Sequence, residues 1–256
     1  MSDFLKEIGE IPLNFPKNED LHPNFWKGMK INSIFSSKLR EIAQDIVESL
    51  EISKFLKDIV ITGSVASYNW HSLSDIDLHI LLDFEEIDEN VELVSKFLHQ
   101  KRINWNKAHK ILLAGHEVEI YFQDIKEEHH SAGVYSLVQS RWLQKPVKDT
   151  RDYDLCAIKC KAESIERDID MISYLFYRKE YRKSHELSQI IRDKVKKLRQ
   201  SGLDSAGVHS VENLAFKVLR NRGKLTKLMA LSTQSYDGMH SASNLNQIKI
   251  KVDKNV

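Results

Sequence analysis

The sequence predicts an α+β fold, with a small mixed sheet and its helices in the first part of the chain and a helical bundle in the second. Up to about residue 150, short apolar runs typical of strands alternate with helical periods, whereas beyond it the helical periods are long and turn residues are few. The 256 residues include only 9 glycines and 4 prolines, which favours helices over an architecture of strands and turns.

Four segments are expected along the chain. Residues 1–28 hold three of the prolines and are predicted to form an extended arm. Residues 29–150 are predicted to form a mixed α/β domain, residues 151–233 a helical domain, and residues 234–256 a polar tail.

Apolar residues spaced three and four apart predict the helices, and short apolar runs predict the strands. In the first domain the predicted elements are a helix at 31–52, a strand at 58–62, a short helix at 64–70, a strand at 75–83, a helix from 87 to between 98 and 105, and strands at 110–113, 117–122 and 134–138. Beyond them, helices are predicted at 153–177, 179–199 and 208–231, with breaks near Arg178 and at Ser201-Gly202, and an edge strand at 247–252.

The composition excludes a disulfide scaffold and a membrane-spanning chain. Cys156 and Cys160 are the only cysteines, too few for a disulfide framework or a four-thiolate zinc site. No apolar run approaches the roughly 20 residues that a membrane span needs, and the charged N-terminus is not a secretory signal. A reduced, cytoplasmic protein is therefore expected.

Charge is unevenly distributed, although the net charge is only +1. Residues 58–150 contain nine Lys/Arg against fifteen Asp/Glu, whereas residues 151–230 contain eighteen against eleven. An acidic region that collects metal and a basic region that faces an anion would produce this division. Solvated helix faces would explain the basic half equally well.

The aspartates of Asp75-Ile-Asp-Leu-His lie on a predicted strand and share one of its faces. Because side chains alternate along a strand, Asp75, Asp77 and His79 point one way, while the apolar residues between them can enter the core. Two carboxylates roughly 6–7 Å apart repel each other unless a divalent cation lies between them. For His79, a histidine satisfied within the sheet is the default interpretation.

Gly63 and Ser64 are expected at the end of the preceding strand, just before the predicted short helix. Glycine lets a backbone approach a ligand closely, and a helix N-terminus offers free N–H groups to a phosphate. The hydroxyl of Ser64 can add a hydrogen bond. A phosphate cradle that faces a metal-binding pair of carboxylates is what phosphoryl or nucleotidyl transfer requires.

This pattern resembles that of the DNA polymerase β-like nucleotidyltransferase superfamily, and in particular its minimal and antibiotic-modifying members. The superfamily pattern is a hydrophobic residue, Gly, Gly or Ser, about nine to thirteen residues, and then Asp-hydrophobic-Asp/Glu-hydrophobic. Here it reads Thr62-Gly-Ser, ten residues, and Asp75-Ile-Asp-Leu, with Thr62 at the hydrophobic position. The resemblance covers residues 58–123 and implies that residues 29–150 form the catalytic domain.

The resemblance also implies the roles of the site residues. Asp75 and Asp77 would bind two Mg²⁺ or Mn²⁺ ions, and Gly63 and Ser64 would hold the triphosphate of an NTP, with ATP as the first guess. A third carboxylate on a later strand is implied as well. Glu119 fits it better than Glu117 because both neighbours of Glu119 are apolar.

One departure from the family concerns the phosphate-neutralising arginine. Minimal members often have Ala-Arg-Gly after the Gly-Ser, whereas Ala66-Ser-Tyr stands here. Another cation must therefore neutralise the triphosphate. Lys179, Arg182 and Lys183 are candidates, although a solvated helix face explains them better.

The leading hypothesis is a metal-dependent nucleotidyltransferase that moves a nucleoside monophosphate from an NTP to a hydroxyl acceptor and releases pyrophosphate. RNA or another polyanion is slightly favoured as acceptor by the basic helical half, and a protein, a small molecule or a nucleotide stays open, as does the oligomeric state. The alternative is a non-catalytic nucleotide-binding partner protein, such as an antitoxin or a regulatory subunit. A glycosyltransferase using Asp75 and Asp77 for a metal and a nucleotide-sugar is a weaker rival.

Overall fold

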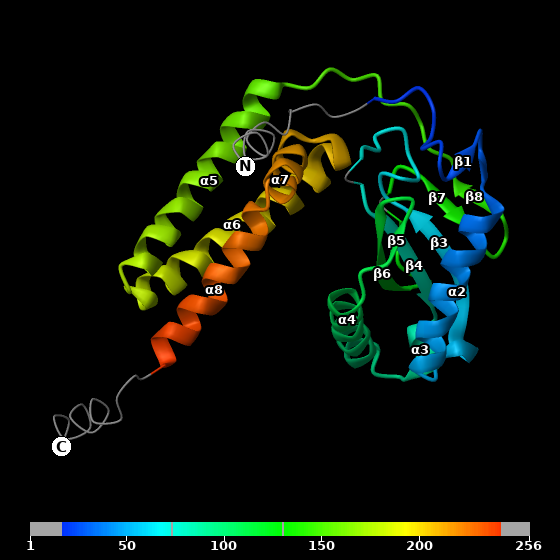
Figure 1. Ribbon diagram of the computed structural model, residues 1–256, viewed down its shortest axis with the longest axis horizontal. Coiled ribbons are helices and arrows are strands. Elements are labelled where there is room, and N and C mark those ends of the chain that lie inside the picture. Colours follow the sequence, from blue (N-terminus) through cyan, green and yellow to red (C-terminus); the bar gives the residue numbers. More distant parts are fainter. Residues whose placement is uncertain (1–16, 73, 130, 242–256) are drawn as a thin grey trace. The chain divides into compact units, whose positions relative to one another are not determined.

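The computed structural model describes residues 17–72, 74–129 and 131–241 (Figure 1). These residues form two compact units, and the chain passes from one to the other between Arg151 and Asp152. The first unit is built on a mixed sheet and the second is entirely helical, so the predicted α+β class is confirmed. Within the described residues, no helix is both long enough and apolar enough to cross a lipid bilayer.

The first unit contains a six-stranded sheet with the strand order β5-β6-β4-β3-β7-β8. Its strands are β3 (Leu56–Thr62), β4 (Ile76–Leu82), β5 (Leu112–Leu113), β6 (His116–Asp124), β7 (Val134–Ser136) and β8 (Arg141–Gln144). β3 and β4 are antiparallel, whereas β4 and β6 are parallel. The predicted strands are therefore present, and β8 is an additional strand that the sequence pattern did not predict.

One face of this sheet is buried under helices. The helices of the unit are α2 (Ser33–Ser49), α3 (Phe84–Ile87) and α4 (Val91–Ala108). Apolar side chains of α2 and α4 share one core with alternate residues of β3, β4 and β6, such as Ile61, Leu78 and Ile120. Because neighbouring residues of a strand face opposite sides, the residues between these core positions lie on the other face of the sheet.

The segment before α2 packs into the same core. Trp26–Lys27 (β1) and Lys30–Ile31 (β2) form a small antiparallel pair, and Leu21 and Phe25 are buried beside it. The indole Nε1 of Trp26 donates to the carbonyl of Val65 at 2.8 Å. The described part of the predicted arm, from residue 17 on, is therefore hydrogen-bonded to the loop that follows β3. Residues 1–16 of the predicted arm lie outside the described residues.

The short helix predicted at 64–70 is absent, and a series of turns stands in its place. Side chains compete there with helical hydrogen bonds: the hydroxyl of Ser67 donates to the carbonyl of Ser64 (3.0 Å), and Asn18 Nδ2 donates to the carbonyls of Tyr68 (3.1 Å) and Trp70 (2.7 Å). The prediction that a helix N-terminus faces a phosphate at this point is therefore wrong.

The second unit consists of helices that run side by side (Figure 1). They are α5 (Leu155–Tyr177), α6 (Tyr181–Ala206), α7 (Val211–Asn221) and α8 (Lys224–His240). α6 packs against each of the other three. The break near Arg178 is confirmed, but three other boundaries differ from the prediction.

The predicted break at Ser201-Gly202 does not exist, because α6 continues to Ala206. Gly202 is buried where α7 begins, and an added Cβ would lie 2.5 Å from Ser210 Oγ and 2.7 Å from Glu212 Cβ. This glycine therefore permits a close helix contact and does not end the helix.

The helix predicted at 208–231 is two helices, since the chain turns at Gly223, which has a φ of +67°. α8 extends to His240, so residues 234–240, which were expected in the polar tail, are helical. The strand predicted at 247–252 lies outside the described residues.

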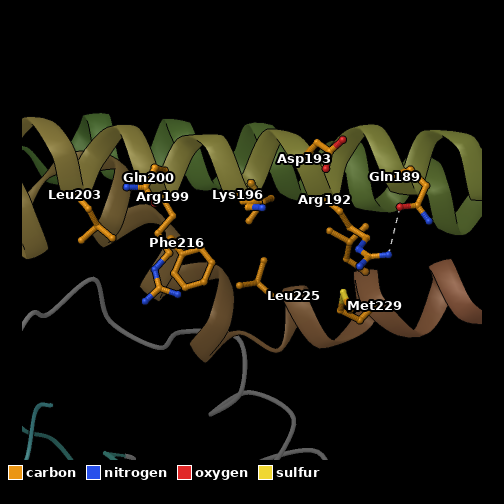
Figure 2. Close-up of a pocket in the computed structure, with 12 residues that line it drawn as sticks. Gln189, Arg192, Asp193, Lys196, Arg199, Gln200, Leu203, Phe216, Leu225 and Met229 are labelled. Carbon is orange, nitrogen blue, oxygen red and sulfur yellow. Dashed lines mark hydrogen bonds between the residues drawn. The ribbon is translucent and has the colours of Figure 1, made fainter. Parts of the chain in front are cut away.

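A groove of about 610 Å³ lies between α6, α7 and α8 (Figure 2). α6 contributes the cations Arg192, Lys196 and Arg199, and α8 contributes the apolar side chains of Leu225 and Met229. Arg192 Nη1 donates to two neutral acceptors, Gln189 Oε1 (3.3 Å) and Ser232 Oγ (3.5 Å).

Candidate active site

The candidate carboxylates lie on the face of the sheet that α2 and α4 leave uncovered. Asp75 immediately precedes β4 and Asp77 lies within it, and both are partly exposed, whereas the intervening Ile76 and the following Leu78 are fully buried. Burial of the apolar alternates fixes the register of the strand, since a shift by one residue would bury both aspartates. The predicted separation of the two faces is thus present in the fold.

Glu119 lies directly beside Asp77, because the two are register partners on the parallel strands β4 and β6. Glu117 lies on the same strand, two residues before Glu119, and pairs with Leu112 of β5. Both glutamates are partly exposed, but only Glu119 stands opposite an aspartate of β4. The choice of Glu119 over Glu117 as the third carboxylate therefore stays a prediction, and the register places Glu119 beside Asp77.

Gly63 is packed against the carboxylate of Asp77. Its φ is +74°, and an added Cβ would lie 1.8 Å from Asp77 Oδ2, far inside van der Waals contact. Only glycine fits a site where the backbone both takes a left-handed conformation and touches a side chain this closely. The backbone after β3 therefore reaches the carboxylates without an intervening side chain.

Ser64 joins the two ends of the loop that connects β3 to β4. Its hydroxyl donates to Ser74 Oγ at 2.8 Å, and the backbone N–H of His71 donates to the same oxygen at 2.9 Å. The carbonyl of Ser74 accepts a hydrogen bond of 2.6 Å from Nδ1 of the buried His116. These bonds hold Gly63 and Asp75 in a fixed relation, because Gly63 precedes Ser64, Asp75 follows Ser74, and the two serines are hydrogen-bonded to each other.

Tyr121 is part of the same face, two residues after Glu119. Its phenol donates a hydrogen bond of 2.6 Å to Glu119 Oε2. Burial, followed by the nearby carboxylates of Asp77 and Glu119, raises the pKa of Tyr121, so the phenol keeps its proton and remains a donor. The sequence signal for this residue was its i+2 spacing from Glu119, which places both on one face of a strand.

His79 stacks on Tyr121, with ring centroids 4.8 Å apart and an interplanar angle of 18°. Its Nδ1 lies 2.8 Å from Gln123 Oε1. Burial lowers the pKa of His79 to about 4, against which the Gln123 hydrogen bond acts only partly, so His79 is neutral at pH 7. This geometry is that of a histidine satisfied within the sheet.

Arg102 of α4 places a guanidinium 4.8 Å from the centre of the Tyr121 ring. α4 is held against β6 by Asn106, whose side-chain amide donates to the carbonyl of Ile120 (3.0 Å) and accepts from its N–H (3.1 Å). Arg102 is therefore a cation beside the carboxylate face. No motif in the sequence indicated Arg102, because along the chain it lies on a separate helix, after β4 and before β6.

The donor set fits a hard divalent cation. Asp75, Asp77 and Glu119 offer only carboxylate oxygens, which are the ligands that Mg²⁺ and Mn²⁺ accept. Among the described residues, however, no three His, Cys, Asp or Glu side chains converge closely enough to form a finished metal site. The strands thus bring the three carboxylates to one face of the sheet. Their side chains would move closer together when an ion binds.

The Gly63-Ser64 turn is packed on the strand that carries Asp77, and Glu119 lies on the parallel neighbouring strand. In agreement, residues 37–149 match the family model described as "Nucleotidyltransferase domain". This segment is therefore a nucleotidyltransferase domain of the polymerase β-like superfamily, and it is followed by the helical region. A comparison with curated proteins gives no match.

Proposed function

We propose that this protein is a metal-dependent nucleotidyltransferase that moves a nucleoside monophosphate from an NTP to a hydroxyl acceptor and releases pyrophosphate. The observation that supports it most directly is the register of Asp77 with Glu119, with Gly63 packed against the Asp77 carboxylate. The nucleotidyltransferase family of residues 37–149 supports the same class of reaction.

Each site residue has a role in this proposal. Asp75 and Asp77 would hold two Mg²⁺ or Mn²⁺ ions, and Glu119 would hold one of them. The backbone at the partly exposed Gly63 and Ser64 would bind the triphosphate, with ATP as the first candidate nucleotide. When bound, the ions lower the pKa of the acceptor hydroxyl and neutralise charge on the triphosphate.

Arg102 is the proposed replacement for the arginine that is missing after Ser64. Its guanidinium contacts the carboxylate face through the ring of Tyr121. An arginine at this position can contact phosphate oxygens with its planar fork of donors. Arg102→Gln should therefore raise the KM for the NTP more than it lowers kcat.

The proposed acceptor is RNA or another polyanion. The groove between α6, α7 and α8 supports this choice, since it is lined by three cations and one carboxylate, that of Asp193. Electrostatic contacts to phosphates supply much of the affinity of proteins for nucleic acids. An NTP-consuming reaction also agrees with the cytoplasmic location expected from the sequence.

The decisive experiment is release of pyrophosphate from each NTP, with Mg²⁺ and with EDTA, in the presence of total cell RNA, protein or metabolites. An α-labelled NTP then shows which fraction receives the nucleotide. Asp77→Asn keeps the shape of the side chain and removes one charge, so turnover should fall by several orders of magnitude, on the scale of removing a central electrostatic group.

Two outcomes would contradict the proposal. Turnover by Asp77→Asn at the wild-type rate would show that the carboxylate face is not the site of the reaction. In the second outcome, the wild type binds NTP but releases no pyrophosphate with cell RNA, protein or metabolites, in Mg²⁺ or in Mn²⁺. This result would favour the alternative, a non-catalytic nucleotide-binding partner protein.

A further inference from the structure

The third carboxylate of this site is a glutamate, which has one more rotatable bond than an aspartate at the same place. A side chain that rotates freely presents either oxygen, or both, and must be ordered before it can bind an ion at a fixed point. The structure contains a group that removes this freedom. Glu119 Oε2 accepts a hydrogen bond of 2.6 Å from the phenol of Tyr121.

Tyr121 is itself held on several sides. Its ring stacks on His79 at 4.8 Å between centroids, and the guanidinium of Arg102 lies 4.8 Å from the ring centre. His79 is in turn hydrogen-bonded to Gln123 at 2.8 Å. The phenol is therefore a donor in a fixed position, because β4, β6 and α4 each contribute to its placement.

We infer that Tyr121 is a positioning residue: by donating a hydrogen bond to Oε2 of Glu119, it holds the carboxylate in one orientation and so orders it for binding to a metal ion. The inference rests on the proposed function, in which Glu119 is a metal ligand. Hydrogen bonds to ligating carboxylates orient them, and their loss typically costs 10- to 100-fold in metal affinity or activity.

The first variant is Tyr121→Phe, which keeps the ring that stacks on His79 and removes only the donor. Binding of Mn²⁺ is measured from its electron paramagnetic resonance signal, with a non-hydrolysable ATP analogue present and no turnover. The Mn²⁺ dissociation constant should rise about tenfold. In kinetics, the Mg²⁺ concentration for half-maximal rate should rise similarly, while the KM for ATP at saturating Mg²⁺ should stay within about twofold.

The matched control is Tyr135→Phe. Tyr135 is a buried tyrosine of β7, and it packs against Trp26 and Trp142, apart from the carboxylates. This variant also removes a buried phenol hydroxyl and should leave the Mn²⁺ dissociation constant unchanged. A melting temperature in EDTA for each variant separates loss of folding from loss of metal binding.

The same Tyr121→Phe change in a Glu119→Asp background tests whether Tyr121 acts through its hydrogen bond to Glu119. Glu119→Asp shortens the side chain and breaks the same hydrogen bond from its other end, so that Tyr121→Phe should then change the Mn²⁺ dissociation constant by less than about twofold. A double-mutant cycle of this kind isolates the coupling between the two residues. An effect of Tyr121→Phe that is equal in both backgrounds would overturn the inference, as would no effect in the wild type.

Failure of this inference is distinguishable from failure of the proposed function. If Asp77→Asn abolishes Mn²⁺ binding while Tyr121→Phe leaves it intact, the metal site stands and Tyr121 has no positioning role. If Asp77→Asn binds Mn²⁺ like the wild type, the carboxylates are not the metal site, and the proposed function fails first.

Discussion

The two units of this protein place their charged side chains in different ways. In the sheet unit, Asp77 and Glu119 are far apart in sequence, and strand register makes them neighbours on a half-exposed face. In the helical unit, many charges are paired between helices. These ion pairs are Lys161–Glu212 (3.0 Å), Lys194–Asp168 (2.7 Å), Arg222–Glu166 (2.8 Å) and Lys227–Asp170 (3.2 Å).

This difference indicates what each unit is organised to do. Like charges placed side by side destabilise a fold unless a partner or a ligand neutralises them, which agrees with our proposal that the carboxylate face binds metal ions. Opposite charges paired across helices at the surface contribute little each and consume part of the basic excess. The groove beside α6 is where cations gather without an equal number of carboxylates.

The largest effect on stability should come from Gly63→Ala, which tests whether the backbone approach to Asp77 is essential. The new Cβ would lie 1.8 Å from Asp77 Oδ2, and an L-residue is strained at a φ of +74°. We expect a loss of about 100-fold or more in pyrophosphate release, and a loss of about 3 kcal/mol in the free energy of unfolding. Steady-state kinetics and urea unfolding measure the two quantities.

Gly115→Ala is the matched control, because Gly115 also has a positive φ (+87°) but nothing lies within 4 Å of its added Cβ. It should cost only the backbone strain, about 1 kcal/mol, and should leave turnover unchanged. Equal losses of turnover in the two variants would show that general destabilisation, and not the Asp77 contact, causes the effect.

The sequence predicted the sheet unit better than the helical unit, for a physical reason. Strand alternation at Asp75 to His79 assigned the two faces without knowledge of the partner strands. The choice of Glu119 followed from its apolar neighbours, and its place beside Asp77 emerged only with the register. Tyr121 was not predicted, although its i+2 spacing places it on the face of Glu119, and Arg102 was not predicted because its contact with the Tyr121 ring depends on tertiary packing.

Helix boundaries were harder to predict, because the apolar period continues through a break. The period across Gly223 predicted one helix, whereas its left-handed conformation separates α7 from α8. Gly202 gave the opposite error, since glycine is a usual sign of a helix end but is used here for close packing. Ser67 and Asn18 replaced the predicted short helix by turns through side-chain hydrogen bonds that no periodicity reveals.

A second prediction concerns the pH dependence of stability in the sheet unit. In EDTA, His79 should bind a proton in the unfolded chain below about pH 6.5 but in the folded protein only below about pH 4. Acidification from pH 7.5 to 4 should therefore destabilise the fold, by at most about 3 kcal/mol from this residue. His79→Gln should flatten this part of the pH profile of urea unfolding.

The control is His99→Gln, at an exposed position of α4, which should keep the wild-type slope between pH 7.5 and 5. A His79→Gln profile parallel to that of the wild type would mean that His79 takes up its proton equally easily in both states. The wild type and the two variants contain the same Asp and Glu residues. The contribution of His79 is therefore measured as the difference between the wild-type and variant pH profiles of urea unfolding.

A third prediction concerns the helical unit and reverses a usual rule. Gly→Ala inside a helix normally stabilises it by about 1 kcal/mol. At Gly202 the Cβ would lie 2.5 Å from Ser210 Oγ and 3.1 Å from the backbone N of Asn213, so we expect a net loss of about 1–2 kcal/mol from overpacking. Mn²⁺ affinity should not change. Ser201→Ala, at the exposed neighbouring position, should change stability by less than about 0.5 kcal/mol.

The smallest effect is expected in the groove, where Lys196→Gln removes one cation from α6. If the groove binds a single-stranded RNA, this variant should weaken binding a few-fold at physiological salt and lower the slope of log affinity against log salt by about 0.7, since one phosphate contact is lost. Lys194→Gln is the control, because Lys194 lies on the same helix but is paired with Asp168 at 2.7 Å. Fluorescence anisotropy with a labelled oligonucleotide measures both slopes. Equal slopes for the two variants would contradict binding in the groove, and affinity independent of salt would favour a small-molecule acceptor over a nucleic acid.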